Sequence, residues 1–374
     1  MEKIKDIANQ FCNKQKENIL DISTNDSGNI NRTYVVTYEH NNKKEKIIIQ
    51  KINTTVFKEP YKLMNNIVNV TNWISEETKK NGDACPCLKV IKTIDGNPLA
   101  VVPDENGENQ YYRAYNFIEN SITYDVSTDT KIVYNTGKAF GHFQKMLDKF
   151  PVNSIEDTIP DFHNTRKRYK QFLLDVIRDT CGRVKTVMPE IEYLIKNSDN
   201  IANIVQGLED GTIPVRVTHN DTKENNIMMD KTTGEAKTVV DLDTVMQGSS
   251  LYDYGDGIRS TASTAAEDEK DLSKVYLNNE LFESYTDGYL SEMAPYLKQS
   301  EVKNMALGVQ ILTFELAVRF LNDYINGDTY FKITYPMHNL DRARNQIKLL
   351  QDITSKKSYM DDYINNSYQK ILKK

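Results

Sequence analysis

The chain of 374 residues exceeds what one hydrophobic core usually holds, so we expect two lobes or domains. Hydrophobic residues make up 39% and charged residues 27%, a composition typical of folded globular proteins and not of disordered chains. The 47 basic and 53 acidic side chains leave a formal charge of −6, which disfavours a general polyanion binder. Nucleic acid is therefore not an expected partner.

The sequence contains no stretch of the kind that spans a membrane, which needs about 18 uninterrupted apolar residues. The most apolar helix candidate, residues 305–321, carries Gln310, Glu315 and Arg319. The first residues, MEKIKDIANQFCNKQ, alternate charged with apolar side chains and lack the continuous hydrophobic region of a signal peptide. We therefore expect a cytoplasmic protein without a membrane partner.

Cysteine usage agrees with that expectation. The cysteines are too few and too scattered for a disulfide framework, and the pair in Cys85-Pro-Cys87 has no second cluster that would complete a zinc site. All of them are predicted to be reduced thiols, namely Cys12, Cys85, Cys87 and Cys181.

The first part of the chain predicts short strands around one helix. Residues 33–40 and 46–52 are rich in Val, Ile, Thr and Tyr and flank a polar turn, which indicates an antiparallel hairpin. Residues 61–79 place apolar side chains at intervals of three and four, as a helix requires. Residues 88–94 and 111–118 are two further strand candidates, separated by turn sequences.

The rest of the chain is mainly helical in pattern. Between residues 215 and 243 lie three short β-type segments, with Asp230 to Gly234 as the turn between the last two. Helical periodicity covers residues 130–150, 166–179, 188–206, 274–293, 301–325 and 340–353. We therefore predict an α+β protein in two lobes: a small antiparallel β-rich lobe, residues 1–118, and a larger mainly helical lobe, residues 119–374.

The strongest motif is the block VTHNDTKENN at residues 217–226, followed by the apolar strand IMM and, after the turn, by VVD ending at residue 241. It matches the kinase template, in which a catalytic Asp lies in a loop, a metal-binding Asn follows five residues later, and a second metal-binding Asp ends the next hairpin. These positions are Asp221, Asn226 and Asp241. The order of a β-rich lobe followed by a helical lobe also agrees with a protein-kinase-like fold.

The residue types suit phosphoryl transfer. Mg²⁺ prefers oxygen ligands and shares them with substrate phosphates, so Asn226 and Asp241 are the predicted ligands. Asp221 would accept the proton of the substrate hydroxyl and align it with the γ-phosphorus of ATP, and Lys223 would neutralise phosphate charge. Any one of these residues alone is better explained as a turn or a cap, and only the combination favours catalysis. His219 is either a scaffold residue or a participant.

The front of the chain carries weaker signals for nucleotide binding. Residues 27–34 contain Gly28 in a strand-turn-strand element where kinases cover the ATP phosphates, although an ordinary hairpin turn explains one glycine equally well. Lys51 ends a strand and could reach the α- and β-phosphates, as the template lysine does. The alternative is a surface lysine, because Glu59, the nearest carboxylate, precedes the helix.

At these residues the chain resembles the aminoglycoside phosphotransferase and choline kinase superfamily, and more closely the N-acetylhexosamine 1-kinases. The resemblance covers most of the chain. The segments that carry it are 50–54 (QKINT), 63–67 (LMNNI), 159–165 (IPDFHNT), 218–256, 319–324 (RFLNDY) and 327–331 (GDTYF). It implies transfer of the γ-phosphate of ATP, with Mg²⁺, to the anomeric hydroxyl of N-acetylglucosamine or N-acetylgalactosamine.

The resemblance also implies residue roles. Thr244, Arg319 and Tyr330 would contact the sugar, and Asp221, Asn226 and Asp241 would keep the roles given above. The segment containing Phe117 and Ile118 resembles the hinge that meets adenine. The family often has histidine as a sugar contact after the glycine of the front loop, where this chain has Asn29, an amide that can still hydrogen-bond a hydroxyl.

Several alternatives remain open from the sequence. Arg319 could pair with a buried carboxylate such as Asp253 or Asp256 instead of a ligand, and those two aspartates are predicted to brace the catalytic loop. The same scaffold also serves aminoglycoside, choline and homoserine kinases, and acidic residues including Asp323 could suit a cationic acceptor. A catalytically dead kinase-like scaffold is disfavoured because it has no need of Asp221 together with both metal ligands. No oligomeric state follows from the sequence.

Overall fold

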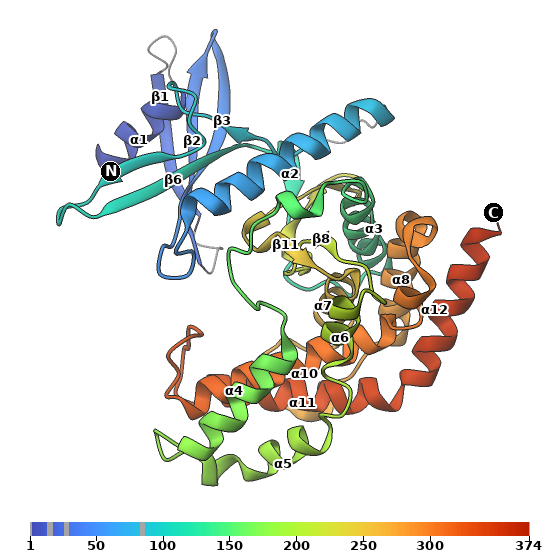
Figure 1. Ribbon diagram of the computed structural model, residues 1–374. Coiled ribbons are helices and arrows are strands. Elements are labelled where there is room, and N and C mark those ends of the chain that lie inside the picture. The colour runs from blue at the N-terminus through green and yellow to red at the C-terminus, as the bar shows by residue number, and fades with distance from the viewer. Residues whose placement is uncertain (1, 13–17, 26–29, 83–86, 374) are drawn as a thin grey trace. The chain divides into compact units, whose positions relative to one another are not determined.

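The computed structural model describes residues 2–12, 18–25, 30–82 and 87–373 (Figure 1). The chain forms two compact units. The first contains residues 1–121 together with the returning segments 153–159 and 240–246, and the second contains 122–152, 160–239 and 247–374. The predicted α+β class is confirmed, with an antiparallel sheet in the N-terminal region and a mainly helical remainder.

The first unit is built on a six-stranded antiparallel sheet with the order β1-β2-β3-β6-β4 and β5 paired to β6. Its strands are β1 (Asn18–Asn25), β2 (Arg32–His40), β3 (Lys43–Lys51), β4 (Val90–Ile91), β5 (Ala100–Pro103) and β6 (Asn109–Asn116). The predicted hairpin is β2 and β3. Its two turn residues, Asn41 and Asn42, have φ of 50° and 60°, a left-handed conformation that asparagine tolerates and that tight hairpins require.

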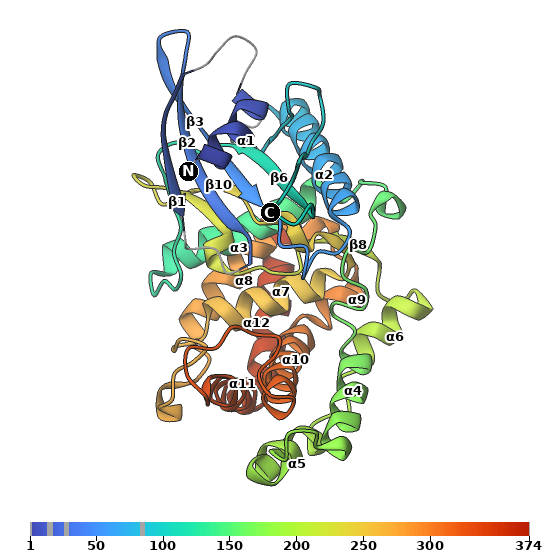
Figure 2. The same ribbon diagram turned by 90° about the vertical axis from the view of Figure 1, so that its left-hand side faces the viewer.

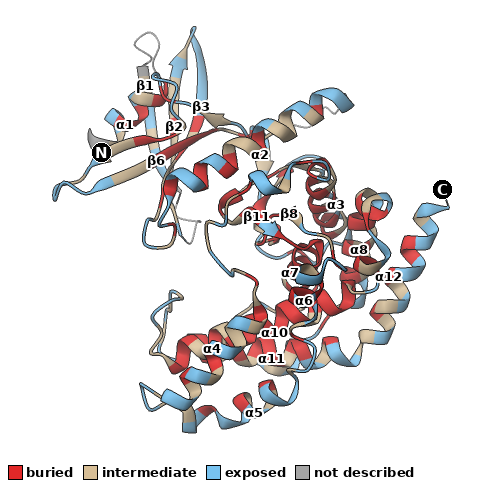
Figure 3. Ribbon diagram, viewed as in Figure 1, coloured by how far each residue is buried: buried red, intermediate tan, exposed pale blue. Residues whose placement is uncertain are grey.

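Two helices accompany this sheet in the first unit. Helix α1 (Glu2–Cys12) buries apolar side chains with one face of β2, β3 and β6. Helix α2 (Pro60–Asn81) corresponds to the predicted helix at 61–79. It begins with proline, whose missing N–H costs nothing in the first turn, and ends at Gly82 in the left-handed conformation. Its buried positions form one stripe along the helix (Figure 3).

The second unit contains the remaining helices: α3 (Thr130–Met146), α4 (Thr165–Arg178), α5 (Met188–Lys196), α6 (Asn203–Asp210), α7 (Ser250–Thr261), α8 (Asn279–Met293), α9 (Gln299–Val302), α10 (Met305–Ile325), α11 (His338–Ser355) and α12 (Lys357–Leu372). The single helix predicted over 188–206 is wrong. It breaks into α5 and α6 around Asn197-Ser198-Asp199-Asn200, because such side chains compete for backbone hydrogen bonds and favour turns.

Short strands complete the structure: β7 (Ser121–Ile122), β8 (Arg216–Thr218), β9 (Ile227–Asp230), β10 (Ala236–Val239) and β11 (Met246–Gly248). They form two small sheets, one with the order β10-β9-β7 and one pairing β11 with β8. The predicted turn at Asp230 to Gly234 joins β9 to β10, and the N–H of Gly234 donates to the carbonyl of Asp230.

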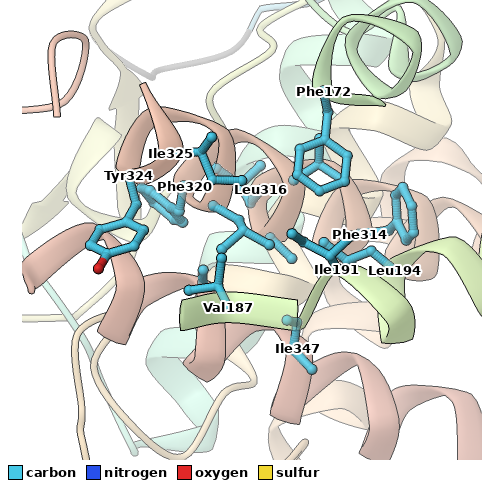
Figure 4. Packing of buried hydrophobic residues seen from close by; sticks show 14 of the residues in the cluster. Phe172, Val187, Ile191, Leu194, Phe314, Leu316, Phe320, Tyr324, Ile325 and Ile347 are labelled. Carbon is cyan, nitrogen blue, oxygen red and sulfur yellow. The ribbon is translucent and has the colours of Figure 1, made fainter. Parts of the chain in front are cut away.

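Helix α10 runs through the centre of the second unit and packs against α4, α7 and α11 (Figure 2). Its side chains join those of α4, α5 and α11 in one hydrophobic cluster, which includes Phe172, Phe314 and Ile347 (Figure 4). Among the described helices α10 alone is long and apolar enough to cross a membrane, and most of its apolar window is buried in this unit. The apolar composition noted at 305–321 is therefore that of a core helix.

Candidate active site

The loop between β8 and β9 brings together three of the predicted functional side chains. The side-chain amide nitrogen of Asn226 donates to the carbonyl oxygen of Asp221 at 2.8 Å and to its Oδ2 at 3.1 Å. The Nζ of Lys223 lies 3.1 Å from Asp221 Oδ1. The amide nitrogen of Asn226 therefore faces Asp221, and the Oδ1 of Asn226 is an oxygen of the kind that Mg²⁺ prefers as a ligand.

Electrostatics keep Asp221 ionised. Burial alone would raise the pKa of this carboxyl, but the charge of Lys223 and the hydrogen bonds from Lys223 and Asn226 outweigh burial, so the pKa lies below its ordinary value. The charge of Asp221 in turn raises the pKa of Lys223. At neutral pH Asp221 can therefore accept a hydrogen bond from a hydroxyl.

Two buried aspartates of α7 accept hydrogen bonds from the backbone of the loop between β8 and β9, as predicted. Asp253 accepts from the backbone N–H of His219 at 2.9 Å and of Asn220 at 2.7 Å. Asp256 accepts from the N–H of Thr222 at 3.1 Å. Their bonds stabilise a loop in which Asn220 adopts a left-handed conformation, with φ of 65°.

His219 is fully buried, and its ring lies edge-on to Phe140 and Phe143 with centroids 5.5 and 5.7 Å away. Its Nδ1 accepts from the backbone N–H of Asp221 at 3.3 Å. These contacts favour the scaffold role over participation in catalysis, because the imidazole is engaged in positioning the backbone of Asp221.

Arg319 of α10 lies among aromatic rings. Its guanidinium carbon is 5.5 Å from the ring centroid of Phe162, 5.4 Å from that of Phe331 and 5.9 Å from that of Tyr330. No described residue makes a hydrogen bond or an ion pair with this guanidinium, and the proposed partner Asp256 pairs with Arg259. The rings fix the plane of Arg319 and leave its N–H groups available to a ligand.

The loop that carries Tyr330 is anchored to the same helix. Both carboxylate oxygens of Asp323 are used: Oδ1 accepts from the backbone N–H of Thr329 at 2.9 Å and of Tyr330 at 2.8 Å, and Oδ2 accepts from that of Phe331 at 2.9 Å. Asp323 is therefore committed to the loop and does not face an acceptor. Sequence reasoning had placed Asp323 near the site but had missed this anchoring function.

A buried network joins the surroundings of Arg319 to the loop between β8 and β9. His163, next to Phe162, contacts Glu315 Oε1 at 2.9 Å through Nδ1 and the carbonyl oxygen of Asn220 at 3.1 Å through Nε2. Asn220 immediately precedes Asp221, so the aromatic rings around Arg319 and the carboxylate of Asp221 are connected within the second unit. Glu315 is fully buried and also accepts from Thr165 at 2.6 Å.

The other predicted site residues belong to the first unit or are not described. Asp241 has φ of 58° and begins the short 3-10 turn Leu242–Thr244, which contains Thr244. Ile118 is buried, and Phe117 has the Nζ of Lys46 4.9 Å from its ring centroid. Gly28 and Asn29 lie outside the described residues. The functions assigned to these side chains from the sequence stay predictions, as does the domain boundary at residue 118.

Glu224, also in the loop, is a buried carboxyl that sequence reasoning did not single out. Its Oε2 accepts from the N–H of Ser127 at 2.8 Å, and its Oε1 is buried without a hydrogen-bond partner among the described residues. Burial raises the pKa of Glu224 to about 7, and the charge of Asp125 contributes further. The folded protein therefore binds a proton that the unfolded chain releases at lower pH.

We expect Glu224→Gln to remove part of the pH dependence of stability. Between the ordinary pKa of 4.5 and about 7 the folded state binds more protons than the unfolded state, so the free energy of unfolding falls as pH rises. The variant should be more stable than the parent by about 2 kcal/mol at pH 8 and equal to it below pH 4.5. Urea unfolding across this range measures the effect, with the exposed Glu235→Gln as control; parallel curves for parent and Glu224→Gln would contradict it.

Comparison with known proteins places this geometry in context. An aminopropanol kinase associated with a microcompartment matches with a TM-score of 0.62 and 13% identity over 95% of this chain and 98% of that chain. An amicoumacin kinase solved with AMP-PNP and Ca²⁺ matches with a TM-score of 0.58 and 12% identity, over 95% of this chain and 93% of that chain. Choline kinase from Cryptosporidium parvum matches with a TM-score of 0.55 and 15% identity over 97% of each chain. These similarities confirm the predicted kinase-like fold.

A family model for phosphotransferase enzymes matches residues 21–290, which include the whole loop between β8 and β9. The match covers more than half of the chain and contains both predicted metal ligands. The chain therefore belongs to the phosphotransferase enzyme family and shares the fold of the aminopropanol, amicoumacin and choline kinases.

Proposed function

We propose that the protein is an ATP- and Mg²⁺-dependent kinase that phosphorylates the anomeric hydroxyl of an N-acetylhexosamine. Asp221 would orient and deprotonate that hydroxyl. Asn226 and Asp241 would hold the metal, which when bound neutralises the charge of the β- and γ-phosphates. Lys223 would stabilise the charge that develops on the transferred phosphoryl group. The carbonyl and N–H groups near Phe117 and Ile118 would meet adenine.

The observation that favours a sugar is the Arg319 cluster, connected through His163 to the catalytic loop. A planar guanidinium offers a fixed set of donors to hydroxyl and acetamido oxygens, and an exposed tyrosine such as Tyr330 offers a ring face and a hydroxyl. Both suit a neutral ligand rich in acceptor atoms. Arg168 adds a second guanidinium near Arg319, and burial and then the charge of Arg319 lower the pKa of Arg168.

The same surroundings disfavour a cationic acceptor such as an aminoglycoside or an amino alcohol. The three aspartates that could have met a cation are engaged elsewhere: Asp253 with backbone N–H groups, Asp256 with Arg259, and Asp323 with the loop of Tyr330. The aromatic rings that could have enclosed an ammonium group already face Arg319. A cationic acceptor there would meet the positive charges of Arg319 and Arg168, and the nearby carboxylate of Glu315 is already engaged by His163 and Thr165.

A panel of acceptors tests the proposal. The purified protein is incubated with ATP, Mg²⁺ and N-acetylglucosamine, N-acetylgalactosamine, glucose, choline, aminopropanol or kanamycin, and ADP release is followed while phosphorus NMR locates the new phosphate. Turnover of an N-acetylhexosamine with an anomeric phosphate is the expected result. Turnover of only the cationic acceptors would reject the sugar assignment, and no turnover with any acceptor would reject the proposed activity.

We expect Arg319→Ala to raise the KM for the sugar about 10- to 100-fold and to leave the KM for ATP within about twofold, because one hydrogen bond to a charged group is worth about 1.5–3 kcal/mol. Arg319→Lys should recover little, since an ammonium group keeps the charge but not the planar donor set. The control is Arg344→Ala, which removes an arginine of α11 that pairs with Glu190. An unchanged KM for the sugar in Arg319→Ala would show that Arg319 does not bind the acceptor.

A further inference from the structure

The side chains of β3 divide between two faces of the sheet, and the division separates Lys51 from its neighbour Gln50. Successive residues of a strand point to opposite faces, so Lys51 shares the face of Ile47 and Ile49. Those isoleucines are buried in the cluster that includes α1. Gln50 lies on the other face, directly opposite Arg113 of β6. The buried cation on this second face is therefore an arginine from the neighbouring strand.

Arg113 is almost completely buried, and each end of its guanidinium has a partner. Nε and Nη2 donate to the Oε1 of Gln50 at 3.1 and 2.9 Å, and the Nε2 of Gln50 donates to Thr33 at 3.1 Å. Nη1 forms an ion pair with Asp243 Oδ1. The charge of Asp241 also acts on Arg113, as one of the interactions that keep it protonated. Arg113 thus connects strands β2, β3 and β6 to the turn at 241–244.

Asp243 is held on both of its oxygens. While Oδ1 faces Arg113, Oδ2 accepts from the side-chain amide of Asn31 at 2.5 Å. The other end of the Asn31 amide accepts from the backbone N–H of Asn53 at 3.0 Å. Asp243 is therefore engaged by protein groups on both oxygens and serves as a counter-ion and an anchor of this turn.

The backbone of the turn needs such an anchor. Asp241 has φ of 58° and ψ of 57°, a left-handed conformation that is unfavourable for a non-glycine residue and persists only where its surroundings hold it. Two residues later Asp243 is fixed by Arg113 and Asn31. A buried ion pair contributes little net stability compared with apolar side chains of similar volume, so the reason for this pair lies in the conformation it selects.

We propose that Arg113 is the positioning residue of the metal-binding turn: by holding Asp243, it fixes the conformation in which Asp241 presents its carboxylate to the nucleotide-bound cation. The proposal rests on the function proposed above, because that function makes Asp241 a metal ligand. It also assigns to an arginine of β6 a role that the sequence had not suggested for any residue of that strand.

The test measures metal affinity separately from turnover. Mn²⁺ replaces Mg²⁺, and electron paramagnetic resonance follows its binding to the full chain in the presence of AMP-PNP. The double variant Arg113→Met/Asp243→Leu removes both charges at once, so no unpaired charge is left buried and the protein should fold. We expect its Mn²⁺ affinity to fall about 10-fold or more, as loss of a group supporting a metal ligand does, with metal-free nucleotide affinity unchanged.

Two further variants make the result specific. Arg113→Lys keeps the charge opposite Asp243 but cannot bond Gln50 in the same geometry, so its Mn²⁺ affinity should lie between those of the parent and the double variant. Arg216→Met breaks the buried pair with Glu301 in the second unit and should lower the unfolding midpoint without changing Mn²⁺ affinity.

The outcomes separate this inference from the proposed function. If Asp241→Ala loses Mn²⁺ while the folded double variant binds it like the parent, Arg113 has no positioning role and the function still stands. If Asp241→Ala binds Mn²⁺ like the parent, Asp241 is not a ligand, and both the proposed metal site and the role of Arg113 are overturned. Loss of affinity in both variants, with Arg113→Lys intermediate, supports the proposal.

Discussion

Replacing Asp221 with asparagine should lower kcat by about 10³-fold or more and leave ATP affinity within about twofold, because removing a general base costs about 10²- to 10⁴-fold. The amide matches the carboxylate in size, so the loop should keep its conformation. It cannot accept a proton from the acceptor hydroxyl, and Lys223, 3.1 Å away in the parent, loses its counter-ion. ADP release with the acceptor identified in the panel measures kcat, and calorimetry measures ATP binding.

A matched aspartate outside the loop controls for general effects. Asp271 caps the short 3-10 helix at Leu272–Lys274 by accepting from Ser273, and Asp271→Asn should leave both kcat and ATP affinity unchanged. Normal turnover in Asp221→Asn would show that phosphoryl transfer here needs no base at this position. Loss of ATP binding in the same variant would instead assign Asp221 to the nucleotide site.

The second large effect concerns stability: Glu315→Gln is expected to lower the free energy of unfolding at pH 7 by about 3 kcal/mol, as breaking a buried ion pair does. Burial alone would raise the pKa of Glu315, but His163, Arg168 and Arg319 outweigh it and bring the pKa to about 2. Removing the negative charge leaves the partly buried Arg168 without its carboxylate and weakens the contact between His163 and the loop that precedes Asp221. Urea unfolding and acceptor KM measure the two consequences.

The contribution of Glu315 to the free energy of unfolding should depend on pH in a defined direction. A carboxyl whose folded pKa is depressed stabilises the protein above its unfolded pKa of 4.5, and that contribution is lost as pH falls toward 2. The difference between parent and Glu315→Gln should therefore be complete at pH 7 and shrink below pH 4.5. A constant difference at all pH values would mean that packing, and not charge, is what the substitution changes.

Glu292 provides the matched control for Glu315. Its pKa is also about 2, chiefly because of hydrogen bonds from His142 and then Lys145, but it retains contact with solvent and lies on α8. Glu292→Gln should cost about 1 kcal/mol, because partly exposed pairs contribute little, and should leave the acceptor KM unchanged. An equal loss of unfolding free energy in the two variants would contradict a specific stabilising role for the network around His163.

Features that depend on neighbours along the chain could be predicted from the order of residues alone. Asp221 and Asn226 are five residues apart in one loop, so their contact follows from local geometry, and the turn at Asp230 to Gly234 places β9 beside β10. Helices α2, α3 and α10 follow from periodicity, because a stripe of apolar side chains must be buried along each. The break between α5 and α6 also has a local cause, the four polar residues 197–200, but the helical periodicity on both sides of them favoured one continuous helix.

Contacts between residues that are distant in the chain became visible only in the folded structure. The three successive isoleucines of β3 hide the alternation that would have shown which face Lys51 occupies. Arg113 and Asp243 are far apart in the chain, and they meet because the segment 240–246 returns to the first unit. The position of Arg319 among three rings likewise depends on loops folding onto α10. Such pairings depend on loop closure and packing of the whole fold, which no local pattern of residue types records.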